Sequence, residues 1–365
     1  MTFINPVGFL RRRVAGGLLR PSWIRSGGLL PSIAALVVLI LRSPGIAPAA
    51  EPWADARLPV TNGLHLWIDA SRQNPARGER GLPPLSPIAD TADYLLDGSG
   101  GRRDLVQPLE ERRPRFAQDF NGAFLSFDGV DDFLASSASG ARAAEVTLFL
   151  VTRVRTNAGL FRAFFSANRA GRNDYTSGFN LDLSSAATPG LSRINAEGPG
   201  FSGEANLCTT PLPFQRWTVM TLVCAPGPGG VRLYLDGKPQ GARDRVAGSL
   251  DLDELTLGAR HYSNDAHRPH AQNFLAGDVA ECLVYAAPVA ERDRERIEAE
   301  FVARGEWIEA EWQRAQEEAV TLREHGTRSA EERAPRAARC NERLLALTLE
   351  RIESRHQAEL QAAEA

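Results

Sequence analysis

Residues 146–154 read Val-Thr-Leu-Phe-Leu-Val-Thr-Arg-Val, a run rich in β-branched and aromatic side chains. Successive side chains of a β-strand point to opposite faces of the sheet. The even-numbered positions Val146, Leu148, Leu150 and Val154 would therefore share one face. This composition and spacing predict a strand that turns its even-numbered side chains toward a core.

Similar short apolar runs recur between about Leu58 and Pro288, separated by Gly, Asp, Asn and Pro. They are Leu64–Ile68, Phe124–Phe127, Phe161–Ser166, Phe179–Leu183, Trp217–Cys224, Val231–Leu235, Glu254–Leu257 and Val279–Tyr285. Turn signals stand at the strand ends, at Asp236-Gly237 and over Pro226–Gly230. With no helical pattern between the runs, the sequence predicts an all-β fold, a single antiparallel β-sandwich over residues 58–290.

The composition excludes several classes of protein. The chain has 365 residues, 43% of them hydrophobic and 24% charged, with a formal net charge of −3. These values exclude a collagen, a disordered tail, a disulfide-knotted mini-protein and a polytopic membrane protein. Its 32 Gly and 23 Pro favour a fold with many turns. Because acidic residues slightly exceed basic ones, no nucleic-acid partner is expected.

The N-terminal residues 1–49 have the pattern of an export signal. A basic segment precedes the apolar run Leu29–Leu41, which is short of the ~20 residues that span a membrane. Small residues at Ala47–Ala49 then offer a cleavage site, and the basic residues are Arg11, Arg12, Arg13, Arg20 and Arg25. Arg42 and the long basic segment leave an uncleaved membrane anchor as the alternative. The rest of the chain is expected to be secreted or to lie in the periplasm or cell envelope.

Residues 291–365 form a separate, charged segment dense in Glu, Arg and Ala. Apolar side chains recur there at steps of three, four and seven, which predicts an α-helical extension interrupted near Gly326 and Pro335. The stripe contains Ile297, Phe301, Ile308, Trp312, Ala315, Ala319 and Leu322, and after the break Leu345, Leu349, Ile352, His356 and Leu360. The two helices could form a hairpin, self-associate as a coiled coil with another copy, or remain a solvated tail.

Five motifs within the sandwich region carry a family resemblance. Residues 125–134 read Leu-Ser-Phe-Asp-Gly-Val-Asp-Asp-Phe-Leu, and residues 231–238 after Trp217 read Val-Arg-Leu-Tyr-Leu-Asp-Gly-Lys. The others are Gly-Leu-His-Leu-Trp-Ile-Asp-Ala-Ser at 63–71, Asp-Gly-Ser-Gly with Arg-Asp-Leu at 97–105, and Phe-Leu-Ala-Gly-Asp-Val-Ala-Glu-Cys-Leu-Val-Tyr at 274–285. In this order they resemble a LamG-like domain of the concanavalin A-like lectin/glucanase superfamily.

This resemblance implies an antiparallel jelly roll, and it covers neither the export signal nor the tail after about Gly305. The superfamily contains lectins, adhesion modules and enzymes, so its members do not share one function. Carbohydrate or an extracellular protein is the partner that the resemblance implies.

The motif residues also have structural roles to fill. Leu125 and Phe127 would point into the core, while Asp128 and Asp131 cap the following turn through side-chain to backbone hydrogen bonds. Glu281, among apolar neighbours on a predicted strand, lies either on a solvated face or in an internal pair.

No motif of the sequence predicts catalysis. A glucanase of this superfamily carries the arrangement Glu-x-Asp-x-x-Glu, which neither Asp251–Glu254 nor Asn180–Asp182 matches. Asp251 and Asp253 do alternate onto one face, which leaves a divergent glycoside hydrolase as an alternative. The chain contains no G-x-S-x-G elbow, phosphate-binding loop or H-E-x-x-H motif.

Two loop segments are the candidate ligand-binding surface. Asp174 and Tyr175 lie in one, and His261, Tyr262 and Asn264 open the other. Tyrosines in such loops could stack on a sugar ring, although lone loop aromatics more often cap the packing of a domain.

The second segment also holds candidate metal ligands. Asp265, His267 and His270 could bind a transition metal, and Asp265 with Asn264 and backbone carbonyls could bind calcium. Their spacing matches no strict ligand pattern, so a polar, exposed loop without a metal is the alternative.

Four cysteines leave the question of disulfides open. Export permits disulfides, but Cys208 and Cys224 are disfavoured as a pair, because Cys224 lies ~20 Å along the strand after Trp217. Cys224 and Cys282 could pair only if their strands adjoin, and buried free thiols are the alternative. Cys340 lies in the helical extension.

Taken together, these patterns predict an exported, non-catalytic β-sandwich that binds carbohydrate or an extracellular protein. A structural protein that assembles through its C-terminal helices is the second alternative, and a divergent glycoside hydrolase is the third.

Overall fold

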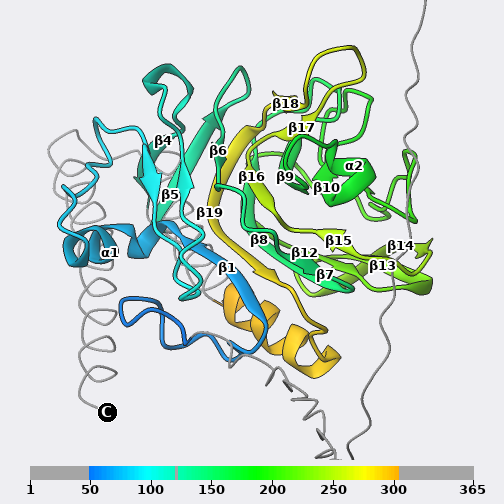
Figure 1. Ribbon diagram of the computed structural model, residues 1–365, viewed down its shortest axis with the longest axis horizontal. Coiled ribbons are helices and arrows are strands. Elements are labelled where there is room, and N and C mark those ends of the chain that lie inside the picture. Colours follow the sequence, from blue (N-terminus) through cyan, green and yellow to red (C-terminus); the bar gives the residue numbers. More distant parts are fainter. Residues whose placement is uncertain (1–48, 120–121, 304–365) are drawn as a thin grey trace, which may run out of the picture. The chain divides into compact units, whose positions relative to one another are not determined.

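The computed structural model describes residues 49–119 and 122–303, which contain two large antiparallel β-sheets (Figure 1). Residues 1–48, and residues 304–365 of the helical extension, lie outside the described residues. The export signal, the pairing state of Cys340 and the coiled coil therefore remain predictions. Among the described helices, none has the length and hydropathy needed to cross a membrane.

Sheet A has the strand order β14-β13-β12-β8-β19-β5-β4, and β1 also pairs with β19. Its strands are β1 (Leu64–Asp69), β4 (Arg115–Asp119), β5 (Gly122–Asp128), β8 (Val146–Val154), β12 (Thr218–Cys224), β13 (Gly227–Leu235), β14 (Lys238–Arg245) and β19 (Ala276–Tyr285). Sheet B has the order β11-β10-β9-β16-β6-β3-β2. Its strands are β2 (Tyr94–Leu95), β3 (Leu105–Val106), β6 (Leu134–Ala135), β9 (Ala163–Asn168), β10 (Phe179–Asp182), β11 (Asn195–Glu197) and β16 (Glu254–Leu257).

The main core lies between the two sheets. Val146, Leu148, Leu150 and Val154 of β8 all belong to it, as their spacing predicts. Sheet B contributes its own alternate side chains, which include Phe165, Phe179, Leu181, Leu255 and Leu257. The structure thus confirms the predicted all-β class and the antiparallel sandwich.

Short elements complete the domain. Two small strand pairs are β7 (Arg142–Ala143) with β15 (Leu250–Asp251) and β17 (Arg260–Tyr262) with β18 (His270–Gln272). The helical elements between the strands are η1 (Ala70–Arg72), α1 (Gln73–Glu79), η2 (Glu110–Arg112) and α2 (Asp174–Ser177), and a further helix begins at residue 291.

The expectation of no helix between the strands is therefore wrong. The buried side chain of Arg77 in α1 donates hydrogen bonds to the carbonyl oxygens of Pro83 and Tyr94. These tertiary contacts stabilise a short helix that periodicity alone does not predict.

A second apolar cluster covers the outer face of sheet A. Trp67, Phe149 and Tyr285 point outward from their strands and pack against residues from both flanks of the sandwich. Trp53 and Leu58 come from the N-terminal side, and Ile297 and Phe301 come from the helix that begins at residue 291. Residues on both sides of the predicted range 58–290 thus complete the sandwich.

Two turns contain the predicted residues. Asp236 and Gly237 have φ values of 49° and 75° and join Leu235 to Lys238, the two-residue hairpin that their sequence predicts. The expected turn over Pro226–Gly230 is shorter than predicted, because β13 already begins at Gly227 and forms a bulge against β14.

Two questions that the sequence leaves open concern buried polar groups of sheet A and the cysteines. Glu281, for which the sequence leaves two alternatives, accepts a hydrogen bond of 2.8 Å from Trp67 Nε1. Cys208, Cys224 and Cys282 are buried free thiols. Because β12 and β19 both border β8 and not each other, Cys224 and Cys282 cannot form a disulfide.

We expect Trp67→Phe to lower the free energy of unfolding by about 1–3 kcal/mol, because it removes a donor from the buried Glu281 carboxylate. Trp53→Phe is the matched control, since the buried Trp53 Nε1 has no hydrogen-bond partner among the described residues. Chemical denaturation of both variants checks this, and equal losses of stability would contradict it.

Candidate functional site

The outer face of sheet B is polar, although it is buried. Side chains that alternate with the core residues of β9, β10, β11 and β16 point away from the core. They are fully buried, and include Ser166, Asn168, Asn180, Asp182, Asn195 and Thr256. Such side chains need hydrogen-bond partners, and part of these come from the same sheet, as in the pair of Asn168 with Glu254.

Helix α2 and the β17–β18 hairpin lie over this polar face. Figure 1 shows α2 beside β9 and β10 and the hairpin above them, and α2 contacts β9, β10 and β17. The segments that cover the sheet are far apart in the sequence, and one side chain of β17, Arg260, joins them.

Arg260 is 3% exposed and binds carboxylates from two sides. Its Nε and Nη2 each donate a hydrogen bond of 2.8 Å to the carboxylate of Asp174 in α2. Its Nη1 donates to Asp182 Oδ2 of β10 at 2.9 Å and lies 3.5 Å from Glu197 Oε2 of β11. A bidentate guanidinium–carboxylate pair is directional as well as strong, so it fixes α2 against β17.

Asp182 lies at the base of this network and is completely buried. Its carboxylate accepts hydrogen bonds from Ser184 N at 2.7 Å and Asn195 Nδ2 at 3.2 Å. The Asn180 amide bridges the pair, donating to Asp182 Oδ2 at 2.8 Å and accepting from Arg260 Nη2 at 3.0 Å. Burial raises the pKa of Asp182 to about 7, against the opposing effect of Arg260 and these donors.

Three aromatic rings surround the same guanidinium. The Arg260 Cζ atom lies 4.9 Å from the ring centroid of Tyr262 and 5.8 Å from those of Tyr175 and Phe161. We call these three residues the aromatic triad. All three are partly exposed, and each comes from a different segment of the chain.

Asparagine side chains fix the hydroxyl groups of the triad. Tyr175 donates a hydrogen bond of 2.8 Å to Asn264 Oδ1 and accepts one of 2.9 Å from Asn173. Asn273 donates one of 2.7 Å to the hydroxyl of Tyr262. The triad therefore has a polar rim beside its partly exposed rings.

The structure brings the two predicted loop segments together. Tyr175 and Tyr262 contact edge to face, with ring centroids 6.2 Å apart, and Asn264 joins them through Tyr175. Asp174 is fully buried, with both oxygens bound to Arg260. His261 is half-buried, and burial lowers the pKa of its imidazole.

Sequence reasoning missed Arg260 and Phe161. Arginine accounts for nearly all basic residues of the chain, so a single Arg carries little signal. Phe161 was expected within a strand that in fact begins at Ala163. The apolar β16 just before Arg260 was the one available sign of its burial.

The predicted metal ligands are only partly brought together. His267 Nδ1 lies 2.8 Å from Asp265 Oδ1, whereas His270 Nδ1 contacts the carbonyl oxygen of Arg268 at 3.1 Å. Asp265 and His267 are exposed, and their partners are within the loop itself. The three side chains thus do not point at a common position.

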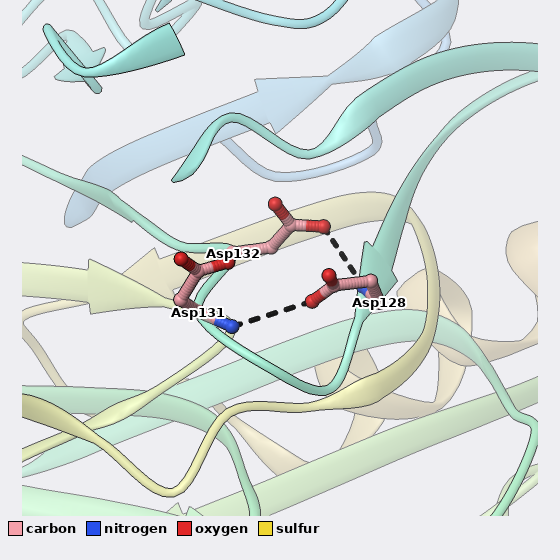
Figure 2. A group of neighbouring side chains, drawn as sticks. All are labelled: Asp128, Asp131 and Asp132. Atoms are coloured by element: carbon pink, nitrogen blue, oxygen red, sulfur yellow. Dashed lines mark hydrogen bonds between the residues drawn. The ribbon is translucent and has the colours of Figure 1, made fainter. Parts of the chain in front are cut away.

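Another group of carboxylates lies close together in the turn after β5. Figure 2 shows Asp128, Asp131 and Asp132, whose oxygens lie within 4.8 Å of one another and could hold a cation such as calcium. Asp128 Oδ1 accepts from Val130 N at 2.7 Å and Asp131 N at 3.3 Å, as predicted for a turn cap. The second capping side chain is Asp132 and not Asp131, because Asp132 Oδ2 accepts from Asp128 N.

The remaining acid pair serves structural contacts. Asp251 is buried and binds Arg142 at 2.7 Å and Arg169 at 3.2 Å. Asp253 accepts from the backbone nitrogens of Gly140 and Ala170. Both carboxylates thus stabilise the connections around β7, β9 and β15.

No family model matches this chain, and no curated protein is significantly similar to it. The chain has structural similarity to Trypanosoma rangeli sialidase in complex with sialic acid, with a TM-score of 0.42 and 12% identity over 70% of this chain. It spans 35% of that sialidase chain.

Two smaller structures are similar at the same level. Domain 4 of an extracellular arabinanase from Geobacillus stearothermophilus, in complex with arabinotriose, has a TM-score of 0.41 and 13% identity, over 64% of this chain and 97% of that chain. A botulinum neurotoxin type C structure has a TM-score of 0.41 and 9% identity, over 66% and 52%. Similarity of this degree identifies no family, so the concanavalin A-like assignment stays a prediction from the motifs.

We expect Arg260→Met to destabilise the domain by about 3–5 kcal/mol, because it leaves buried carboxylates without their cation. Arg216→Met is the control, since Arg216 binds Asp236 at 2.6 Å in a half-exposed pair that contributes under about 1 kcal/mol. Urea denaturation measures both, and similar effects would refute the role of Arg260.

Asp182 predicts a pH dependence of stability. Its pKa is raised to about 7 in the folded protein, so the proton is bound more tightly there than in the unfolded chain. Stability is then greatest below the unfolded pKa near 4 and falls as pH rises toward 7, by more than about 1 kcal/mol.

Chemical denaturation of wild type and Asp182→Asn between pH 4 and 8 checks this. The free energy of unfolding of the variant should fall much less with rising pH than that of wild type. Asp253→Asn is the control of opposite sign, because backbone hydrogen bonds from Gly140 and Ala170 lower the pKa of Asp253. Profiles of wild type and Asp182→Asn that fall equally between pH 4 and 7 would contradict the prediction.

Proposed function

We propose that this chain is an exported, non-catalytic module that binds carbohydrate at the aromatic triad. The observation that carries the proposal is the convergence of Phe161, Tyr175 and Tyr262 on one buried arginine. Partly exposed rings offer an apolar face to the C–H groups of a sugar, and their hydroxyls and the neighbouring amides offer hydrogen bonds.

The arrangement is also preorganised. Arg260 and the asparagines hold the rings before any ligand arrives, so little side-chain entropy is lost on binding. Asn264 accepts from Tyr175 through Oδ1, and its exposed amide nitrogen can donate to a sugar hydroxyl.

A non-catalytic role is supported by the state of the carboxylates. Glycoside hydrolysis needs two carboxyl groups that reach the glycosidic bond from opposite sides. Asp174 and Asp182 are fully buried and bound to Arg260, below the rings and away from solvent. This arrangement favours binding over hydrolysis.

Export belongs to the proposal through residues 1–49, with a basic segment, an apolar run and a small-residue cleavage site. The module would then act outside the cytoplasm, either free or held at the membrane if the signal is not cleaved. An extracellular glycan is an available partner in either case.

We expect Tyr175→Ala and Tyr262→Ala each to weaken glycan binding at least roughly tenfold, because each removes a stacking surface of about 1–3 kcal/mol. A glycan array identifies the ligand, and titration calorimetry measures its affinity with and without calcium. Tyr94→Ala on β2 is the control, since this half-buried tyrosine lies outside the triad.

Loss of binding in the triad variants alone supports the proposal. A wild-type protein that binds no glycan, or Tyr94→Ala with the same effect, would refute carbohydrate binding at this site. Hydrolysis of any bound glycan would refute the non-catalytic role.

A further inference from the structure

The loop between β8 and β9 has an unusual backbone beside the aromatic triad. Gly159, Leu160 and Phe161 have φ values of 83°, 64° and 55°, so three successive residues are left-handed. Leucine and phenylalanine disfavour this conformation, whereas glycine and asparagine accept it far more readily. Such strain persists only where the surrounding structure enforces it.

Hydrogen bonds from a neighbouring loop enforce it here. Leu160 N donates to Ser185 O at 2.9 Å, and Phe161 N donates to Ser184 O at 2.8 Å. Ser184 is itself left-handed, with a φ of 67°, and its nitrogen binds the Asp182 carboxylate. The strained loop is therefore connected to the Arg260 network through two backbone contacts.

The two strained side chains have different surroundings. The Phe161 ring packs beside Arg260, and this contact accounts for the left-handed backbone of Phe161. Leu160 is 69% exposed, so folding removes little of its apolar side chain from water. An asparagine at that position would relieve the strain and improve solvation, so neither packing nor backbone preference explains an exposed leucine there.

We infer that Leu160 is a ligand-contacting residue of this same site and selects sugars that carry a methyl group, as an N-acetyl or 6-deoxy substituent. This inference rests on the proposed carbohydrate binding. Leu160 adjoins Phe161 in the chain and has no hydrogen-bonding side-chain group, so it can recognise only an apolar part of the ligand. Removing one methyl-sized group from water strengthens binding roughly fourfold.

Matched pairs of sugars test the inference by titration calorimetry. The pairs are N-acetylglucosamine with glucose, N-acetylgalactosamine with galactose, and L-fucose with L-galactose. In the pair that binds, wild type should bind the methyl-bearing member roughly fourfold or more tightly, and Leu160→Asn should remove this preference while binding of the other member is kept.

Leu109→Asn is the matched control. Leu109 is 45% exposed at an ordinary φ of −84°, so its substitution should leave the preference unchanged. In thermal melts Leu160→Asn should be at least as stable as wild type, because asparagine tolerates the left-handed backbone. Leu160→Gly provides a second variant that accepts the same φ.

The outcomes separate this inference from the proposed function. Equal binding of both sugars of a pair, or a preference that survives in both Leu160 variants, overturns the role of Leu160 and leaves carbohydrate binding intact. A melting temperature lowered in both Leu160 variants assigns the leucine to packing and also overturns it. If wild type binds no sugar, the proposed function fails and this inference fails with it.

Discussion

The structure above sheet B depends on the burial of one guanidinium group. Arg260 loses its hydration on folding, and its interaction with Asp174 and Asp182 compensates for that loss only if α2 and β10 hold both carboxylates in place. The interaction therefore imposes a geometry on three separate segments. The aromatic triad is a consequence of that geometry, because its rings pack around the same group.

The two outer faces of the sandwich are covered by different chemistry. On sheet A, Trp67 and Tyr285 pack against Ile297 and Trp53, so apolar contact closes that face. On sheet B, carboxylates and amides meet an arginine and short loops. Apolar packing tolerates small shifts of position, whereas a buried ionic network requires fixed distances and angles. The polar cover is thus the more suitable support for a site that must keep its shape.

Local sequence predicts the strands well where alternation is strong, as in β8 and β16, and the turn at Asp236-Gly237 where positive φ needs glycine. It misses β14, because Lys-Pro-Gln-Gly-Ala-Arg-Asp-Arg has no apolar alternation and pairs only along one edge. Tyr175 and Tyr262 were identified as loop aromatics, but their contact depends on a pairing between Asp174 and Arg260 across 86 positions. Long-range ion pairs and left-handed backbone leave no periodic pattern in the sequence. The sequence therefore does not predict that Arg260 and Phe161 belong to the site.

The cover of sheet A has a further consequence for where the two ends of the domain lie. The first described residues and the helix from residue 291 both pack on the outer face of sheet A, whereas the triad lies beyond the outer face of sheet B. Both connections to the rest of the chain therefore begin on the side away from the rings. If the triad binds a ligand as proposed, that ligand and the two described ends of the domain occupy opposite faces of the sandwich.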